Sequence, residues 1–493
     1  MKERARSAML LLSILVAEGL YLLYAHVGAA SPHATGLSLP WGLPYGSWRP
    51  WTPAGGTALL VGIMAGLLAV WVFQASAAGR RATVRLVFGA ALLHGATLVL
   101  TPGLLSTAVL DDMGYGQILA GHGANPYDTT AASLPQDPIL RAMPRSESPP
   151  LAGPAWISIS SLLVLAGAGG FPSTLLAFRL ASLTAHLING ALILSLARRW
   201  RGPDGMDTPL QATIFYVLNP VLLIQFAAEG RHESIALTWL LLALWLLERA
   251  DRLMSAGCAG MALLIDHVML PATGFVVAQR GWTSGWREAA RAVLVMGGLA
   301  VLAFAPYARG LSPAQFLPPF WIVPEPVGLL AAVQTVLTMA AGPASRFAAR
   351  SVLILWIAAA LGMAVWWWRA ARTTRRPEDI ARNGAVFYLL LLTTGVASFQ
   401  IPAVAWVVGL AALAGGSRVR SAGVCLCAGA AAAQALGTYR LLAESGASSM
   451  PGGRLLVSVV AAAGPILFLL LPPRSSRLDR PVRLDAPARD TLE

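Results

Sequence analysis

The sequence predicts an all-α polytopic membrane protein. Of its 493 residues, 56% are hydrophobic and only 12% are charged, whereas about one quarter of the residues in a soluble domain are charged. The apolar residues form long runs of the kind that cross a bilayer as helices. Basic residues gather at the ends of these runs, as they do at the cytoplasmic ends of membrane spans.

The net charge of +13 fits a membrane protein better than a nucleic-acid-binding protein, because the arginines are tied to the ends of apolar runs. Placing them inside puts both termini in the cytoplasm and turns the inner loops toward anionic lipid head groups. Three clusters carry this argument: Arg80, Arg81 and Arg85; Arg198, Arg199 and Arg201; Arg369, Arg372, Arg375 and Arg376.

Hydropathy and the arginine positions together predict about twelve to fourteen crossings. The first crossing reads as an uncleaved signal-like helix, and a membrane domain over residues 1–473 is followed by a flexible cytoplasmic tail, 474–493. The predicted crossings are 8–27, 59–73, 84–105, 171–197, 211–226, 235–247, 289–305, 352–368, 385–397, 404–414, 422–436 and 455–471.

Three further apolar segments are predicted not to be simple crossings. Residues 151–168 and 327–341 would place arginine clusters outside if they crossed, so we expect them along the outer interface or as re-entrant segments. Residues 255–279 contain Asp266, His267 and Pro271 and are expected to form a broken pair of short helices.

The longest polar segment inside the membrane domain is the loop 106–150, which begins with the paired acids Asp111 and Asp112. A short helix over 111–120 would put Asp112 and Tyr115 on one face. A carboxylate at a membrane face is well placed to take a proton from a hydroxyl group. The alternative is that the acids only cap a helix.

Several motifs resemble those of the C-type glycosyltransferases, and most closely those of the bacterial polyprenol-phosphomannose-dependent mannosyltransferases. The loop matches through Asp111, Asp112, Tyr115 and the segment Gly123, Asn125, Pro126, Tyr127. PPLAGPAW at 149–156, LNPVLLIQFAAEGRHES at 218–234 and IPAVAW at 401–406 follow in the order of the family's motifs. Gly114, Ala152, Asp266 with His267, and the surroundings of Pro402 depart from the family pattern.

The resemblance implies a glycosyltransferase of the cytoplasmic membrane that moves one sugar, expected to be mannose, from a polyprenyl phosphate to a lipid or glycan acceptor outside. Asp112 is then expected to be the general base and Asp111 to assist it. The leaving phosphate needs cations, from Arg231, His232 and Arg309 or from a divalent ion such as magnesium or manganese. Other expected substrate-binding residues are Tyr115, His122, Asn125, Tyr127, Glu229, Glu233, Asp266 and His267.

Different interpretations stay open at this point. Glu229 to Glu233 can form a solvated loop of mutually paired charges, and Asp266 can simply pair with His267. A transporter or lipid flippase using Asp266 and His267 as a proton relay is the main functional alternative. An inactive relative that serves as an assembly partner is another.

Overall fold

In the computed structural model every regular element of the described residues is a helix, which confirms the all-α fold. The structure describes residues 2–28, 53–77, 83–104, 106–150, 152–200, 208–308, 328–342, 346–396, 401–415 and 417–443, and single residues between 458 and 466. Arg309, almost all of the predicted crossing 455–471 and the predicted tail 474–493 lie outside these residues.

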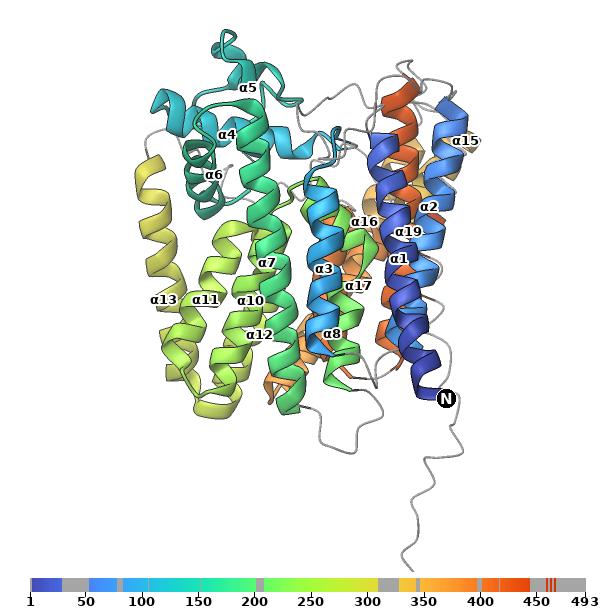
Figure 1. Ribbon diagram of the computed structural model, residues 1–493. Coiled ribbons are helices and arrows are strands. Elements are labelled where there is room, and N and C mark those ends of the chain that lie inside the picture. The colour runs from blue at the N-terminus through green and yellow to red at the C-terminus, as the bar shows by residue number, and fades with distance from the viewer. Residues whose placement is uncertain are drawn as a thin grey trace, which may run out of the picture.

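Long helices stand side by side in a bundle, and three short ones cover one end of it (Figure 1). The first half of the chain supplies α1 (Lys2–Gly28), α2 (Pro53–Ala77), α3 (Val84–Val99), α4 (Ala108–His122), α5 (Pro138–Arg141), α6 (Pro154–Ala166), α7 (Phe171–Trp200), α8 (Pro209–Val217), α9 (Pro220–Leu223) and α10 (Glu233–Glu248). The second half supplies α11 (Arg252–Ile265), α12 (Leu270–Ser284), α13 (Trp286–Phe304), α15 (Leu329–Ala341), α16 (Arg346–Thr373), α17 (Pro377–Thr394), α18 (Val404–Leu413) and α19 (Ser417–Ala443).

Five of the described helices are long and apolar enough to cross a membrane, and a sixth span results if α8 and the segment after it are counted together. These lengths confirm a multi-pass membrane protein. Several other predicted crossings fall on apolar helices of 10–17 residues, such as α3 and the helical segment Ile401–Leu413 that contains α18. The expected number of twelve to fourteen crossings therefore exceeds what helix length supports, and it stays a prediction.

The bundle contains two helix breaks, and each occurs at a polar residue whose side chain caps the helix that follows. After α8 the chain bends by 47°, because Pro220 has no N–H for a continuous helix and the Asn219 side chain caps Leu222 N at 3.2 Å. Asp266 ends α11 and accepts a bond from Val268 N at 3.0 Å. The predicted break within 255–279 is thus confirmed.

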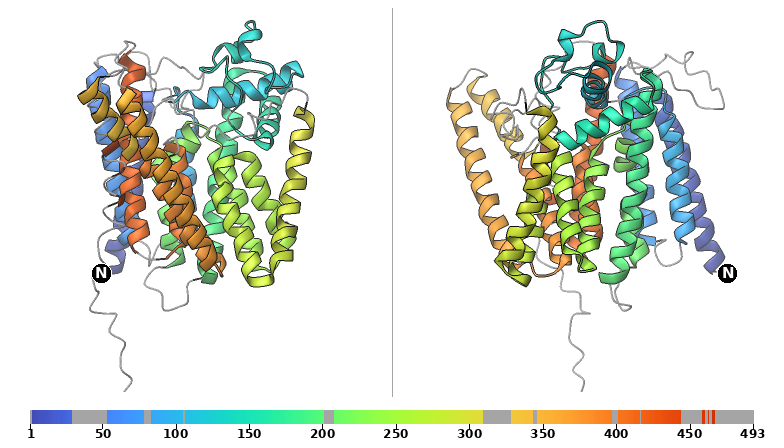
Figure 2. Two further views of the ribbon diagram at one scale, coloured as in Figure 1. Left: turned by 180° about the vertical axis from the view of Figure 1, so that it is seen from behind. Right: turned by 90° about the vertical axis from the view of Figure 1, so that its left-hand side faces the viewer.

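The cover of the bundle consists of α4, α5 and α6, which lie at the end opposite to the N-terminus (Figures 1 and 2). Helix α6 has 13 residues and is about 20 Å long, which is too short for a hydrocarbon core of about 30 Å. This length agrees with the expectation that 151–168 does not cross, and the crossing that follows is the 30-residue α7.

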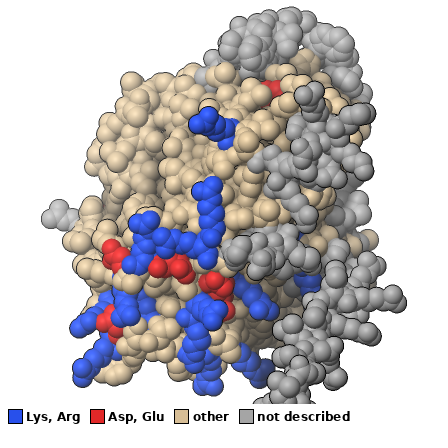
Figure 3. All heavy atoms as spheres, turned by 60° about the horizontal axis from the view of Figure 1, so that its bottom comes forward, with Lys and Arg blue, Asp and Glu red and all other residues tan. Residues whose placement is uncertain are grey.

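Basic side chains gather on the opposite end of the bundle, which comes forward in Figure 3. Arg198 and Arg199 occupy the last turn of α7, and Arg372 occupies the last turn of α16. Some of these guanidinium groups lie over tryptophan rings, such as Arg249 over Trp245 at 3.7 Å and Arg372 over Trp368 at 4.8 Å. The two ends of the bundle therefore differ in charge, as the sequence predicted.

The start of α6 is fixed to the end of α11 by close backbone contact. Gly153 N donates to Ile265 O at 3.1 Å, and a methyl group on Gly153 would overlap the carbonyl group of Leu264. On the other side of α6, a methyl group on Gly116 would lie 2.7 Å from the backbone of Ser160. Small residues thus let α6 pack directly against α4 and α11.

This contact yields a stability prediction. Gly153→Ala should force α6 away from α11 and cost about 1–3 kcal/mol of folding free energy, which thermal unfolding in detergent would measure. The control is Gly62→Ala in α2, where an added methyl group meets nothing within 4 Å. Equal melting temperatures for the two variants would show that the α6–α11 contact is not tight.

Candidate active site between α4 and the start of α10

The paired acids lie on α4 and point into the protein. Asp111 is 3% exposed and Asp112 6%. The residue at the N-cap position of α4 is Thr107, so neither acid caps this helix. The capping interpretation is therefore wrong, because both acids lie inside the helix.

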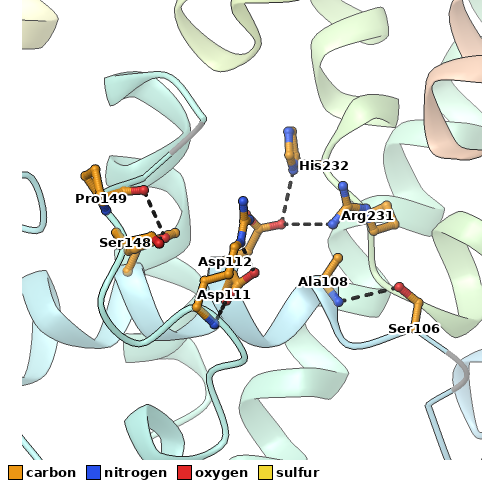
Figure 4. Close-up of polar contacts among 10 residues, drawn as sticks. Ser106, Ala108, Asp111, Asp112, Ser148, Pro149, Arg231 and His232 are labelled. Carbon is orange, nitrogen blue, oxygen red and sulfur yellow. Dashed lines mark hydrogen bonds and ion pairs between the residues drawn. The ribbon is translucent and has the colours of Figure 1, made fainter. Parts of the chain in front are cut away.

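Asp112 is held by the segment that precedes α10 (Figure 4). Its Oδ2 atom lies 3.1 Å from His232 Nδ1 and 3.9 Å from Arg231 Nη1. Arg231 in turn donates to Glu233 Oε1 at 2.7 Å. All four side chains are buried, so the interpretation of this segment as a solvated loop is also wrong.

The electrostatics of this cluster keep Asp112 and His232 ionised at neutral pH. Burial opposes charging of the His232 imidazole, but Glu233 and Asp112 outweigh it and raise the pKa of His232 to about 9. Burial likewise opposes ionisation of Asp112, but His232 and Arg231 outweigh it and lower the pKa of that carboxyl. The cluster therefore contains a permanent carboxylate beside an imidazolium and a guanidinium.

Asp111 faces a different partner. Arg145 donates to it twice, from its backbone N at 3.1 Å and from Nε at 2.8 Å. Despite this ion pair, burial raises the pKa of Asp111. The side chain of Arg145 is 36% exposed, so this contact closes the site toward the outside of the protein.

The helical spacing suggested that Tyr115 and Asp112 share one face of the helix, but the Tyr115 hydroxyl group does not contact Asp112. This hydroxyl group donates to the carbonyl oxygens of Ser148 at 3.1 Å and Pro149 at 3.2 Å. Together with Arg145 it fixes residues 145–149 across α4. We call residues 145–149 the covering segment.

Other residues expected at the site lie apart from the acids. His122 Nε2 lies 3.0 Å from Asp137 Oδ2 near the surface. Asn125 donates to Tyr307 O at 3.2 Å, and the ring of Tyr127 lies edge-on to that of Tyr307 at 5.4 Å. These three residues shape the loop and attach it to the end of α13.

Glu229 lies close to Arg231 in sequence, but its carboxylate accepts hydrogen bonds from other parts of the protein. It accepts from Ser106 N at 3.0 Å and from the hydroxyl group of Tyr24 at 3.4 Å. This carboxylate therefore ties the chain entering α4 to α1 and does not join the Asp112 cluster.

Asp266 extends the Asp112 cluster from the break after α11. It is 6% exposed and close enough to His232 and Glu233 to interact with both electrostatically. His267 follows it in the short helix His267–Met269. Asp266 therefore belongs to the same polar site as Asp112.

Two residues of this site were not assigned from the sequence, although one of them, Trp156, ends the motif PPLAGPAW. Arg145 lies in the middle of a polar loop, where no spacing or periodicity distinguishes it. The ring of Trp156 on α6 stacks on that of His232, with 4.9 Å between ring centroids. An apolar helix supplies this residue, so only the packing of α6 shows its place.

The arrangement does not fit a divalent cation. Within the described residues no three His, Cys, Asp or Glu side chains are grouped to hold a metal ion. Both acids already face cations, Arg145 on one side and Arg231 with His232 on the other. A further cation there would be repelled by these positively charged groups.

The raised pKa of His232 predicts a pH-dependent stability. A group whose pKa is raised in the folded protein contributes fully below its unfolded pKa of 6.5, and the contribution is lost as the pH rises through about 9. The wild type should lose about 3 kcal/mol over this range. Thermal unfolding in detergent measures the loss, and His232→Gln should remove most of this slope. A variant with the wild-type slope would show that His232 is uncharged.

Comparison with known proteins places these residues in a family. The model of the alpha-(1->6)-mannopyranosyltransferase family, N-terminal domain, matches residues 16–281, a range that contains every residue of the Asp112 cluster. Alpha-(1->6)-mannopyranosyltransferase B of Corynebacterium glutamicum is 28% identical over 231 residues, which cover 43% of this chain and 37% of that protein's length. The resemblance predicted from the motifs is confirmed, and the chain belongs to the alpha-(1->6)-mannopyranosyltransferase family.

Proposed function

We propose that this protein transfers a mannosyl group from a polyprenyl-phosphate donor to a hydroxyl group of a lipid or glycan acceptor. The observation that carries the proposal is the buried Asp112 carboxylate, held ionised by His232 and Arg231. A buried charge costs folding free energy, and such arrangements are concentrated at functional sites. Membership in a mannosyltransferase family supports the choice of mannose.

In the proposed reaction the acceptor oxygen attacks the anomeric carbon of mannose and forms the new glycosidic bond. The bond between that carbon and the phosphate oxygen breaks, and the phosphate leaves with the electron pair. The proton of the acceptor hydroxyl passes to Asp112, which acts as general base. Atoms and charge balance without any further reactant.

The contacts favour Asp112 over Asp111 for this role. Both carboxylate oxygens of Asp111 accept bonds from Arg145, whereas Arg231 and His232, just before α10, approach Oδ2 of Asp112. The second oxygen of Asp112 is the better placed to receive a proton. Its lowered pKa makes it a weak base but keeps it ionised at neutral pH.

We propose that Arg231 and His232 also neutralise the leaving phosphate. A planar guanidinium with several donors suits a phosphate better than a point charge does. In the described conformation both cations face carboxylates, so the phosphate would share them with Asp112 and Glu233.

The decisive experiment replaces each acid by its amide. Asp112→Asn removes the proton acceptor at constant size and should lower turnover by roughly two to four orders of magnitude. Transfer of radiolabelled mannose from polyprenyl-phosphate mannose to an alkyl α-mannoside measures it.

Asp111→Asn serves as the matched control and should be milder, because it weakens only the contact with Arg145. Full activity of both variants would rule out the general-base role. An inactive Asp111→Asn beside an active Asp112→Asn would exchange the roles of the two acids.

We further propose that the covered end of the bundle faces outward across a bacterial cytoplasmic membrane, with the basic end inside. A cysteine at the exposed position Ser133 should then react with a membrane-impermeant thiol reagent in intact cells. A cysteine at the exposed Arg287, in the first turn of α13 at the basic end, should react only after lysis. The reverse pattern would contradict this orientation.

A further inference from the structure

One buried donor at the site has no partner. Trp156 is 1% exposed, and within the described residues its indole Nε1 makes no hydrogen bond. Buried N–H groups are almost always paired in folded proteins, because leaving one unpaired costs free energy. An unpaired donor beside ionised groups therefore calls for an explanation.

The position of Trp156 is fixed on several sides. Its ring stacks on His232 with an angle of 28° between the planes, and it meets Phe178 edge-on with 5.8 Å between centroids. The backbone contact of Gly153 with Ile265 holds the start of α6 just before it. The indole cannot easily turn away to find another partner.

The indole N–H lies near Asp112. Burial opposes ionisation of that carboxyl, and His232, Arg231 and a hydrogen-bond-like contact from the Trp156 side chain lower its pKa. That contact does not have the geometry of a full hydrogen bond. The site thus holds a donor without acceptor capacity close to a carboxylate that only accepts.

The chemistry of these two groups selects the ligand. A hydroxyl group is the common substrate group that accepts with its oxygen and donates with its proton. A phosphate oxygen only accepts, and it would meet the negative charge of Asp112. A hydroxyl group satisfies both protein groups, whereas a phosphate satisfies one.

We propose that the indole N–H of Trp156 binds the oxygen of the acceptor hydroxyl while the proton of that hydroxyl points to Asp112. This inference rests on the proposed function and makes Trp156 an acceptor-binding residue.

The test is Trp156→Phe, which keeps an aromatic ring against His232 and removes only the N–H. The KM for an alkyl α-mannoside with a free 6-hydroxyl should rise about five- to tenfold, as expected for one lost hydrogen bond. The KM for polyprenyl-phosphate mannose and the kcat should change less than about twofold, since binding of the acceptor is what is lost.

Trp71→Phe is the matched control. Trp71 is also 1% exposed, but its Nε1 donates to Phe215 O at 3.2 Å. Removing that N–H leaves a buried carbonyl unpaired, so this variant should lower the melting temperature and leave the acceptor KM unchanged. Trp156→Phe should lower the melting temperature less than Trp71→Phe does, because its N–H makes no full hydrogen bond in the folded protein.

An unchanged acceptor KM in Trp156→Phe overturns the inference, and so does a rise confined to the donor KM. Calorimetry measures binding of the alkyl mannoside in the absence of donor. This measurement distinguishes failure of the inference from failure of the proposed function. If the wild type transfers no mannose, the proposed function fails. Equal affinities of wild type and Trp156→Phe for the mannoside then overturn the inference on its own.

Discussion

The contact of Asp112 with His232 and Arg231 is the interaction on which the site depends. It joins α4, which covers the end of the bundle, to the start of α10 inside it. In a low-dielectric surrounding an isolated carboxylate would take up a proton, and an isolated guanidinium would be costly to bury. Each charge is tolerated because the others are present, so the cover and the bundle are fixed relative to each other by the groups proposed to carry the chemistry.

Room for this cluster exists because neighbouring helices stop short. The break at Asn219 and Pro220 leads into a π-helix, Ile224–Ala228, that ends before Arg231, and the break at Asp266 ends α11. Continuous helices at these positions would fill the bundle with apolar side chains. The breaks instead bring polar groups from three segments of the chain to one place beneath α4. Side chains on unbroken helices would not meet there.

Much of the candidate site was predictable. The pair Asp111 and Asp112 and the segment from Arg231 to Glu233 were found because they lie in polar loops at the ends of apolar runs and match the motifs of the family. The broken helix at Asp266 was found because ionisable residues inside apolar sequence are costly and therefore few. Some residues assigned to the site from the sequence make their contacts elsewhere. His122, Asn125 and Tyr127 lie in the polar loop with the acids, but their bonds are to loop and helix-end partners, and Glu229 turns to Tyr24 and Ser106.

The sequence alone determined that the chain is a helical membrane protein, where its basic end lies and which segments cannot cross, because hydrophobicity, length and charge act locally along the chain. Only the tertiary structure decided which partner each charge takes. Arg145 pairs with Asp111 across 34 residues, and Trp156 stacks on His232 because Gly153 and Gly116 allow α6 to approach closely. Such pairings depend on how helices pack against one another, and no local pattern encodes them.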